Sequence, residues 1–168
     1  MKNHTTILLC QTAAFAAIIY IFTAVFHVPT HTGYTHIGDG FLFLAACVLP
    51  APYAAAAGAV GAGLADLLSG YAMWLPGTVI IKSVTALYFS RNTGRILCLR
   101  NLLALVPAWV TCIGGYYVYE ALLTGNWAAA LAGIPGYFTQ SALSTVVFVV
   151  MAVALEPVKQ QVFALNRG

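Results

Sequence analysis

Three charged residues lie at or inside hydrophobic segments of this sequence, and chemistry is most expected there. Asp39, Asp66 and Lys82 are each flanked by long apolar stretches. A charged side chain at the middle of a membrane helix costs about 2.5 to 3.5 kcal/mol on insertion scales. Because such residues are seldom kept without a use, we expect these three to contact a ligand, to pair with one another, or both.

Two structural roles compete with ligand binding for these charges. Asp66 and Lys82 are expected at similar depth on adjacent helices joined by a short loop, where an ion pair would offset part of both desolvation costs. That pair would either only join the two helices or also offer the Lys82 ammonium to a ligand. Asp39 follows Gly38 at the start of a predicted helix, where a carboxylate caps free backbone N–H groups, so capping is its first expected role.

Aromatic and polar side chains gather at the same boundary of the predicted segments. Aromatic belts form at membrane interfaces without any ligand. With carboxylates and amides in the same layer, however, some of these rings are expected to stack on a small heteroaromatic solute that carries hydroxyl groups. The candidate substrate-binding residues are Tyr34, Asp39, Asp66, Tyr71, Trp74, Lys82, Tyr116, Glu120 and Gln140.

Neither a metal site nor catalysis is indicated. The loop between the first two segments carries the possible metal ligands His27, His31, His36 and Asp39. Pro29 interrupts the four-residue spacing of His27 and His31, so a polar loop is the better interpretation. The sequence has no GxxxxGK[ST] phosphate loop, no nucleophile elbow and no HExxH zinc motif. We therefore expect no enzyme, no metal and no cofactor.

The composition is that of an integral membrane protein. The chain is 61% hydrophobic and 7% charged, with a mean hydropathy of +0.89, whereas a soluble domain is roughly one quarter charged. Its 168 residues give room for about six spans of around 20 residues and no separate soluble domain. We expect one membrane-embedded domain over residues 1–168. Because the basic residues are dispersed, nucleic acid is not an expected partner.

Hydrophobic runs predict an all-α protein with six transmembrane helices. The runs cover residues 7–28, 37–49, 53–68, 76–89, 102–123 and 136–155. The second and fourth are shorter than the 17 to 25 residues that a span needs, so they extend into their loops or stop part-way and line a cavity. Small residues such as Gly58, Gly61 and Ala62 give the third segment a smooth face for close packing inside the bundle.

The basic residues predict the orientation. With a cytoplasmic N-terminus, six helices place the loop after the fourth helix and the C-terminus in the cytoplasm as well. That side then receives every basic residue outside a helix: Lys2, Arg91, Arg95, Arg100, Lys159 and Arg167. The positive-inside rule is obeyed. The candidate binding residues then fall in the outer half, so we expect a pocket that opens to the exterior.

The motifs resemble those of one family, the substrate-binding (S) components of energy-coupling factor (ECF) vitamin transporters. The resemblance rests on the six short segments, the Gly33-Tyr34 to Gly38-Asp39 loop, the helix ending Leu64-Ala65-Asp66-Leu67-Leu68-Ser69-Gly70-Tyr71, and the run Pro76-x-Thr78-x-Ile80-Ile81-Lys82. It covers nearly the whole chain. Within the family the sequence is most similar to the riboflavin, pyridoxine and hydroxymethylpyrimidine branch.

The resemblance implies a function and a set of partners. It implies a high-affinity substrate-binding subunit in a prokaryotic plasma membrane, which captures a vitamin from outside and joins one transmembrane coupling subunit and two ATPase subunits. The family's alanine docking motif would fall on Ala13 and Ala17, and its gating loop would be His27 to Asp39. A pyridoxine-like or hydroxymethylpyrimidine-like ring is the leading substrate, with queuine-type bases, pantothenate and riboflavin behind it.

Two functions of other classes remain as alternatives. A membrane-embedded enzyme would use Asp39, Asp66 or Glu120 as an acid or base, and the isolated chain would turn over its substrate. A stand-alone ion-coupled carrier would need no partner, but it would leave the alanine face of the first helix without a role. Inverted repeats, which mark many such carriers, are not evident in the sequence.

Overall fold

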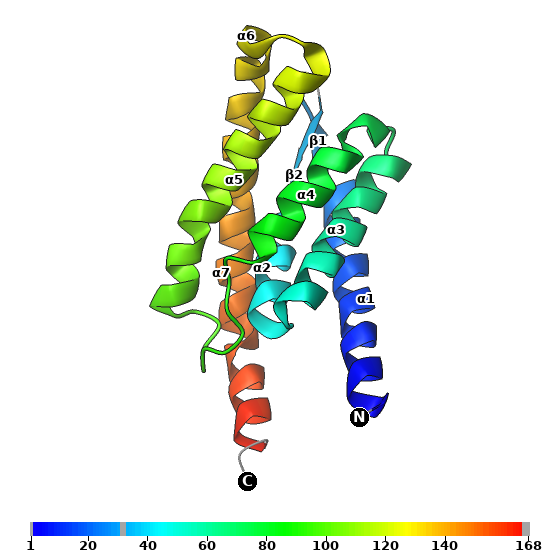
Figure 1. The fold of residues 1–168 in the computed structure, drawn as a ribbon. Helices are drawn as coiled ribbons and strands as arrows, with labels where there is room; N and C mark the ends of the chain where they lie inside the picture. Colours follow the sequence, from blue (N-terminus) through cyan, green and yellow to red (C-terminus); the bar gives the residue numbers. More distant parts are fainter. Residues whose placement is uncertain (1, 31–32, 166–168) are drawn as a thin grey trace.

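The computed structural model describes residues 2–30 and 33–165. Its longer helices are α1 (Lys2–Ala24), α2 (Asp39–Val48), α3 (Ala51–Leu68), α4 (Leu75–Ala86), α5 (Leu99–Thr124) and α7 (Ile134–Leu165). Shorter elements are the strands β1 (His27–Pro29) and β2 (Tyr34–His36), the helix α6 (Trp127–Ala130), and the 3-10 turns η1 (Ala72–Trp74) and η2 (Leu131–Gly133). Figure 1 shows an elongated bundle with the hairpin and α6 at one end.

Four helices are long and apolar enough to cross a membrane. These candidate spans cover His4–Ala24, Ala51–Leu68, Leu99–Thr124 and Trp127–Val158. The second and fourth predicted segments form the 10-residue helix α2 and the 12-residue helix α4. Such helices are about 15 and 18 Å long, roughly half of the 30 Å hydrocarbon core. Among the described residues the structure therefore has a helical bundle in which four helices are long enough to cross a membrane and α2 and α4 are shorter than a span.

Both chain ends lie at the same end of the bundle. Figure 1 places the N- and C-termini at the bottom, with the loop between α4 and α5, and places the hairpin at the top. The described basic residues of that loop, Arg91 and Arg95, are exposed, whereas Arg167 lies outside the described residues. Six segments traversed in alternating directions give this arrangement. That the lower end faces the cytoplasm stays a prediction from charge.

A two-stranded hairpin, which the all-α prediction did not include, connects α1 to α2. The strands β1 and β2 pair antiparallel, with His27 opposite His36 and Pro29 opposite Tyr34. The β-branched residues Val28 and Thr35 form the central pair, as strand propensity favours. Thr35 Oγ1 also donates to the Gly136 carbonyl at the start of α7, 3.2 Å away. The hairpin is therefore tied to the bundle across the top.

Close helix contact depends on the small residues of α3, as predicted. A Cβ on Gly61 would lie 2.5 Å from the backbone oxygen of Ala16 on α1. A Cβ on Gly58 would lie 2.6 Å from the Leu42 side chain on α2. Both positions therefore need glycine, and α3 packs inside the bundle between α1 and α2.

The half of the bundle nearest the termini is filled by aromatic and aliphatic side chains. Phe43, Phe89 and Phe148 form a mutual ring cluster with centroids 5.0 to 6.0 Å apart, and each is at most 5% exposed. Glu156 of α7 accepts the Ile96 N–H of the α4–α5 loop at 2.9 Å. The lower half is therefore a packed core, and the buried polar side chains that line a cavity lie above it.

Candidate functional site

A cavity lies among the helix ends that are opposite the chain termini, below the hairpin. Its walls come from β2, the end of α3, η1, α4, α5 and α7, with the lining residues Gly33, Tyr34, His36, Asp66, Trp74, Thr78, Tyr116, Tyr137 and Gln140. The empty space totals about 310 Å³ when the part open to solvent is included, but only about 20 Å³ admits the centre of a water-sized molecule. That is room for about one water, so side chains must move before a vitamin-sized ligand fits.

Asp66 supplies the carboxylate of this cavity. It lies near the end of α3, is only 3% exposed, and its Oδ1 accepts the Tyr34 hydroxyl at 2.5 Å. Burial and the neighbouring Asp66 raise the pKa of Tyr34 above its ordinary value, so the phenol keeps its proton and donates. The other oxygen, Oδ2, is buried without a hydrogen-bond partner among the described residues. Asp66 thus keeps an unused acceptor at the cavity.

Lys82 pairs with Asp39 and not with Asp66, contrary to the sequence prediction. Lys82 Nζ lies 2.8 Å from both carboxylate oxygens of Asp39. Lys82 follows Leu75, the first residue of α4, by seven residues, about 10 Å along the helix, whereas Asp66 is only about 3 Å from the end of α3. The two residues therefore lie at different depths, and the start of α2 brings Asp39 to the level of Lys82.

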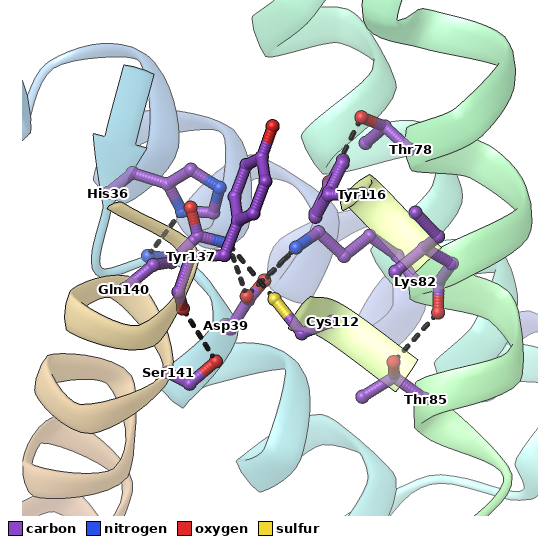
Figure 2. Close-up of polar contacts among 12 residues, drawn as sticks. His36, Asp39, Thr78, Lys82, Thr85, Cys112, Tyr116, Tyr137, Gln140 and Ser141 are labelled. Atoms are coloured by element: carbon purple, nitrogen blue, oxygen red, sulfur yellow. Dashed lines mark hydrogen bonds and ion pairs between the residues drawn. The ribbon is translucent and has the colours of Figure 1, made fainter. Parts of the chain in front are cut away.

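The capping role predicted for Asp39 was also wrong. Asp39 is the first residue of α2, and no side-chain hydrogen bond caps that helix. Its carboxylate instead receives Lys82 from α4 and the Gln140 amide Nε2 from α7, at 2.8 and 2.9 Å. Figure 2 shows these two donors approaching Asp39 from opposite sides. The cluster joins three helices beneath the cavity, and Asp39 and Lys82 do not line it.

Aromatic rings form the upper part of the cavity. Tyr116 and Tyr137 are stacked with centroids 5.3 Å apart, and Trp74 lies edge-on to both at 6.0 and 6.5 Å. Tyr116 also bonds to Thr78 Oγ1 at 3.1 Å, and Lys82 Nζ lies 4.9 Å from the centre of its ring. The rings provide a flat apolar surface such as a heteroaromatic ring would contact.

The predicted residues thus divide into two groups. Five line the cavity: Tyr34, Asp66, Trp74, Tyr116 and Gln140. Tyr71 packs against Tyr34 with centroids 4.7 Å apart, outside the lining. Glu120 is buried behind the wall, where it accepts the Tyr137 hydroxyl at 2.6 Å. Tyr71 and Glu120, like Asp39 and Lys82, therefore support residues of the wall.

His36 and Thr78 line the cavity but were not among the predicted substrate-binding residues. His36 Nδ1 accepts the Gly38 backbone N–H at 3.1 Å, and burial lowers the pKa of His36 to about 3, so the ring is neutral with its proton on Nε2. Thr78 precedes Lys82 by four residues and so shares its helix face. That spacing was the available signal for Thr78; for His36 the sequence offered only a polar loop.

The residues weighed as metal ligands do not form a cluster in the described part of the chain. Among residues 2–30 and 33–165, no group of three or more histidine, cysteine, aspartate or glutamate side chains could hold an ion. His31 lies outside the described residues. His27 bonds to the Ala24 carbonyl at 2.6 Å, and His36 faces the cavity.

The two alanines assigned to partner docking lie on the outside of the bundle. Ala13 and Ala17, one turn apart on α1, are both exposed, whereas Ala16 and Ile19 face α3. This smooth strip is therefore accessible along the membrane-facing side of α1.

Comparisons with known proteins agree with this geometry. The family model described as ECF-type riboflavin transporter, S component, matches residues 3–157, nearly the whole chain. A search of curated proteins found no match. The chain, a helical membrane bundle with a polar-aromatic cavity, therefore belongs to the family described as ECF-type riboflavin transporter, S component.

Proposed function

We propose that this chain captures a small, flat, water-soluble vitamin or vitamin precursor from outside the cell for ATP-driven import by a partner module. The observation that carries the proposal is the cavity around Asp66, which is lined by aromatic rings and in which one carboxylate oxygen is buried without a hydrogen-bond partner in the part of the chain that the structure describes. A buried acceptor of this kind is costly unless a donor completes it. A heteroaromatic ligand with a polar edge would supply that donor.

Family membership removes one alternative. The family consists of transporter subunits, so the chain is a substrate-binding membrane transport component and not an enzyme. S components associate with the ECF module, so the stand-alone carrier is also disfavoured. The finer assignments, a transmembrane coupling subunit, two ATPase subunits, cytoplasmic termini and a prokaryotic plasma membrane, are part of the proposal.

The leading substrate is a single-ring compound of the pyridoxine or hydroxymethylpyrimidine type. The cavity has room for only about one water, so a single-ring compound is the vitamin-like ligand that requires the least movement of the cavity walls. Riboflavin is the second candidate, since the family description names a riboflavin transporter. Its larger ring system would require a greater displacement of the Trp74 and Tyr137 side chains.

Opening of the cavity is assigned to the loop from His27 to Asp39. This loop contains the hairpin, and it holds Tyr34 on Asp66 and Thr35 on the first turn of α7 through one hydrogen bond each. A ligand donor that took the place of the Tyr34 hydroxyl would release one of these two attachments. We expect the loop to open for ligand binding and to close above the bound ligand.

The first experiment identifies the ligand. Mass spectrometry of small molecules that co-purify with the detergent-solubilised chain, followed by calorimetric titration of pyridoxine, hydroxymethylpyrimidine and riboflavin, is expected to give one compound with a submicromolar Kd. Failure of all three to bind, with no retained compound, would contradict the proposal.

The partner assignment has its own test. Replacing Ala13 and Ala17 together by leucine should abolish cellular uptake and leave the ligand Kd of the purified chain unchanged, because both positions are exposed. The matched control is Ala16→Leu, on the face packed against α3, which should instead destabilise the purified chain. Loss of ligand binding in the Ala13 and Ala17 variant would show that these alanines do not serve docking.

A further inference from the structure

We propose that the buried Asp39–Lys82 pair is a positioning device that fixes the Gln140 amide with its carbonyl oxygen toward the cavity. Together with Asp66 Oδ2, that oxygen forms a pair of acceptors that selects ligands with N–H donors. This rests on the function proposed above and names the chemical class of the ligand. Asp39 and Lys82 act through Gln140 and do not touch the ligand themselves.

The first step is the orientation of the amide. A side-chain amide has a donor end and an acceptor end, and a carboxylate paired with an ammonium only accepts hydrogen bonds. Because Asp39 Oδ2 lies 2.9 Å from the Gln140 amide, the NH₂ end must face Asp39. Lys82, at 2.8 Å from both oxygens, holds the carboxylate in place. The amide is thus oriented from below.

The second step is the acceptor left over. With Nε2 directed at Asp39 and at Cys112 Sγ, the opposite end of the amide is Oε1. No hydrogen bond to Oε1 occurs among the described residues, and Gln140 lines the cavity although it is only 2% exposed. Asp66 Oδ2 is the second acceptor of the same cavity without a partner. Two acceptors, of which Asp66 Oδ2 is the fully buried one, therefore await donors from a ligand.

The third step is the complementary donor. His36 Nδ1 is occupied by the Gly38 N–H, so the neutral ring carries its proton on Nε2. The hydroxyl groups of Thr78 and Tyr116 bond to each other, which uses one of their two protons. The groups left for a ligand are then two acceptors, one N–H donor and one hydroxyl proton. A heterocycle that bears N–H donors beside a ring nitrogen or carbonyl acceptor complements this set. Cyclic amides and aminopyrimidines have this pattern, whereas pyridoxine carries no amide or amino N–H.

The test on the wild-type chain compares each probe with its N-methylated form. The pairs are riboflavin with 3-methylriboflavin, and hydroxymethylpyrimidine with its dimethylamino derivative; pyridoxine is the probe without an amide or amino N–H. For whichever pair binds, methylation should weaken Kd by about tenfold or more, because a buried acceptor is left without a donor. Equal affinity of the two members, or tightest binding of pyridoxine, overturns this inference and leaves the proposed function in place. Binding of no probe overturns both.

Two variants test the residues. The affinity ratio is the Kd of the methylated probe divided by the Kd of its parent. Gln140→Met keeps the side-chain length but removes the amide, so this ratio should fall toward the value that Asp66 alone would give. Gln11→Met, the same change on the exposed face of α1, is the matched control and should keep the wild-type ratio. An unchanged ratio in Gln140→Met would overturn the role of Gln140.

The positioning role is tested by replacing the pair as a unit. In the double variant Asp39→Asn with Lys82→Met, no ion is left uncompensated, and exchange of a buried pair for neutral residues is often tolerated. The amide introduced at position 39 can donate or accept, so the Gln140 amide is free to turn and the affinity ratio should drop at least threefold. A folded double variant with the full wild-type ratio would overturn the positioning role. If the double variant does not fold, the ratio in Gln140→Met decides.

Discussion

Asp39 and Asp66 are two aspartates of one bundle, equally buried at 3% exposure, but their surroundings differ. Asp39 has Lys82 within 2.8 Å of both oxygens and Gln140 on one of them. Asp66 has Tyr34 on one oxygen, and its other oxygen is without a partner among the described residues. Burial alone therefore does not distinguish a structural charge from a binding charge. We propose that the completeness of the shell of charged and polar partners distinguishes the structural charge, Asp39, from the binding charge, Asp66.

The largest effect, a loss of folding stability, should follow from removing a partner of the fully paired carboxylate, Asp39. Lys82→Met leaves the Asp39 carboxylate buried without a counter-ion, and removal of one partner of a buried pair costs about 3 to 5 kcal/mol. We expect a strongly lowered Tm or loss of monodisperse protein in detergent, measured by thermal unfolding. The control is Lys82→Met with Asp39→Asn, which should recover most of the loss. A single variant as stable as wild type would mean that the pair does not stabilise the fold.

A change at Asp66, the carboxylate with one oxygen left unpaired among the described residues, should affect ligand binding and not folding. Asp66→Asn removes the charge, and hydrogen bonds to charged groups contribute about 1.5 to 3 kcal/mol, so the ligand Kd should rise about tenfold to a hundredfold. Thermal unfolding should change little. Tyr34→Phe is the matched control, since it removes only the donor to Oδ1. If Asp66→Asn unfolded the chain as Lys82→Met does, the distinction between the two carboxylates would fail.

The smallest effect concerns pH. Burial lowers the pKa of His36 from its ordinary 6.5 to about 3, so the unfolded chain binds a proton at a higher pH than the folded chain does. The contribution of His36 to stability is complete above pH 6.5 and is lost progressively as the pH falls toward 3. The Tm should therefore fall between about pH 7.5 and 5, and less so in His36→Gln. Equal pH dependence in both proteins would show that His36 is not buried as a neutral ring.

The sequence was sufficient for the membrane bundle and for much of the cavity wall. Hydrophobic runs locate the six segments because burial in lipid requires apolar side chains along their whole length. Asp66, Trp74 and Gln140 were found because polar or amphipathic residues at a segment end must lie at one boundary of the membrane. Pattern alone therefore selected five of the lining residues, although it did not test their contact with a ligand.

The pairing of charges could not be obtained in the same way. Choosing Asp39 or Asp66 as the partner of Lys82 requires the depth of each residue to within a few ångströms, and that depth depends on where the short helices α2 and α4 begin. The three-residue strands β1 and β2 are too short to give a periodic signal. His36 was considered only as a metal ligand, and its place at the cavity was missed for the same reason, since that place is set by the hairpin.

The ring cluster of Phe43, Phe89 and Phe148 has a consequence for the membrane itself. These rings fill the bundle between the cavity and the end that carries both termini. In the described part of the chain the cavity is therefore closed toward that end and does not continue as a channel. We expect an idle copy to remain in the bilayer without leaking protons or ions. By the same reasoning, we expect release of a bound ligand on the other side to require that something outside the chain reorient its whole body or change its packing.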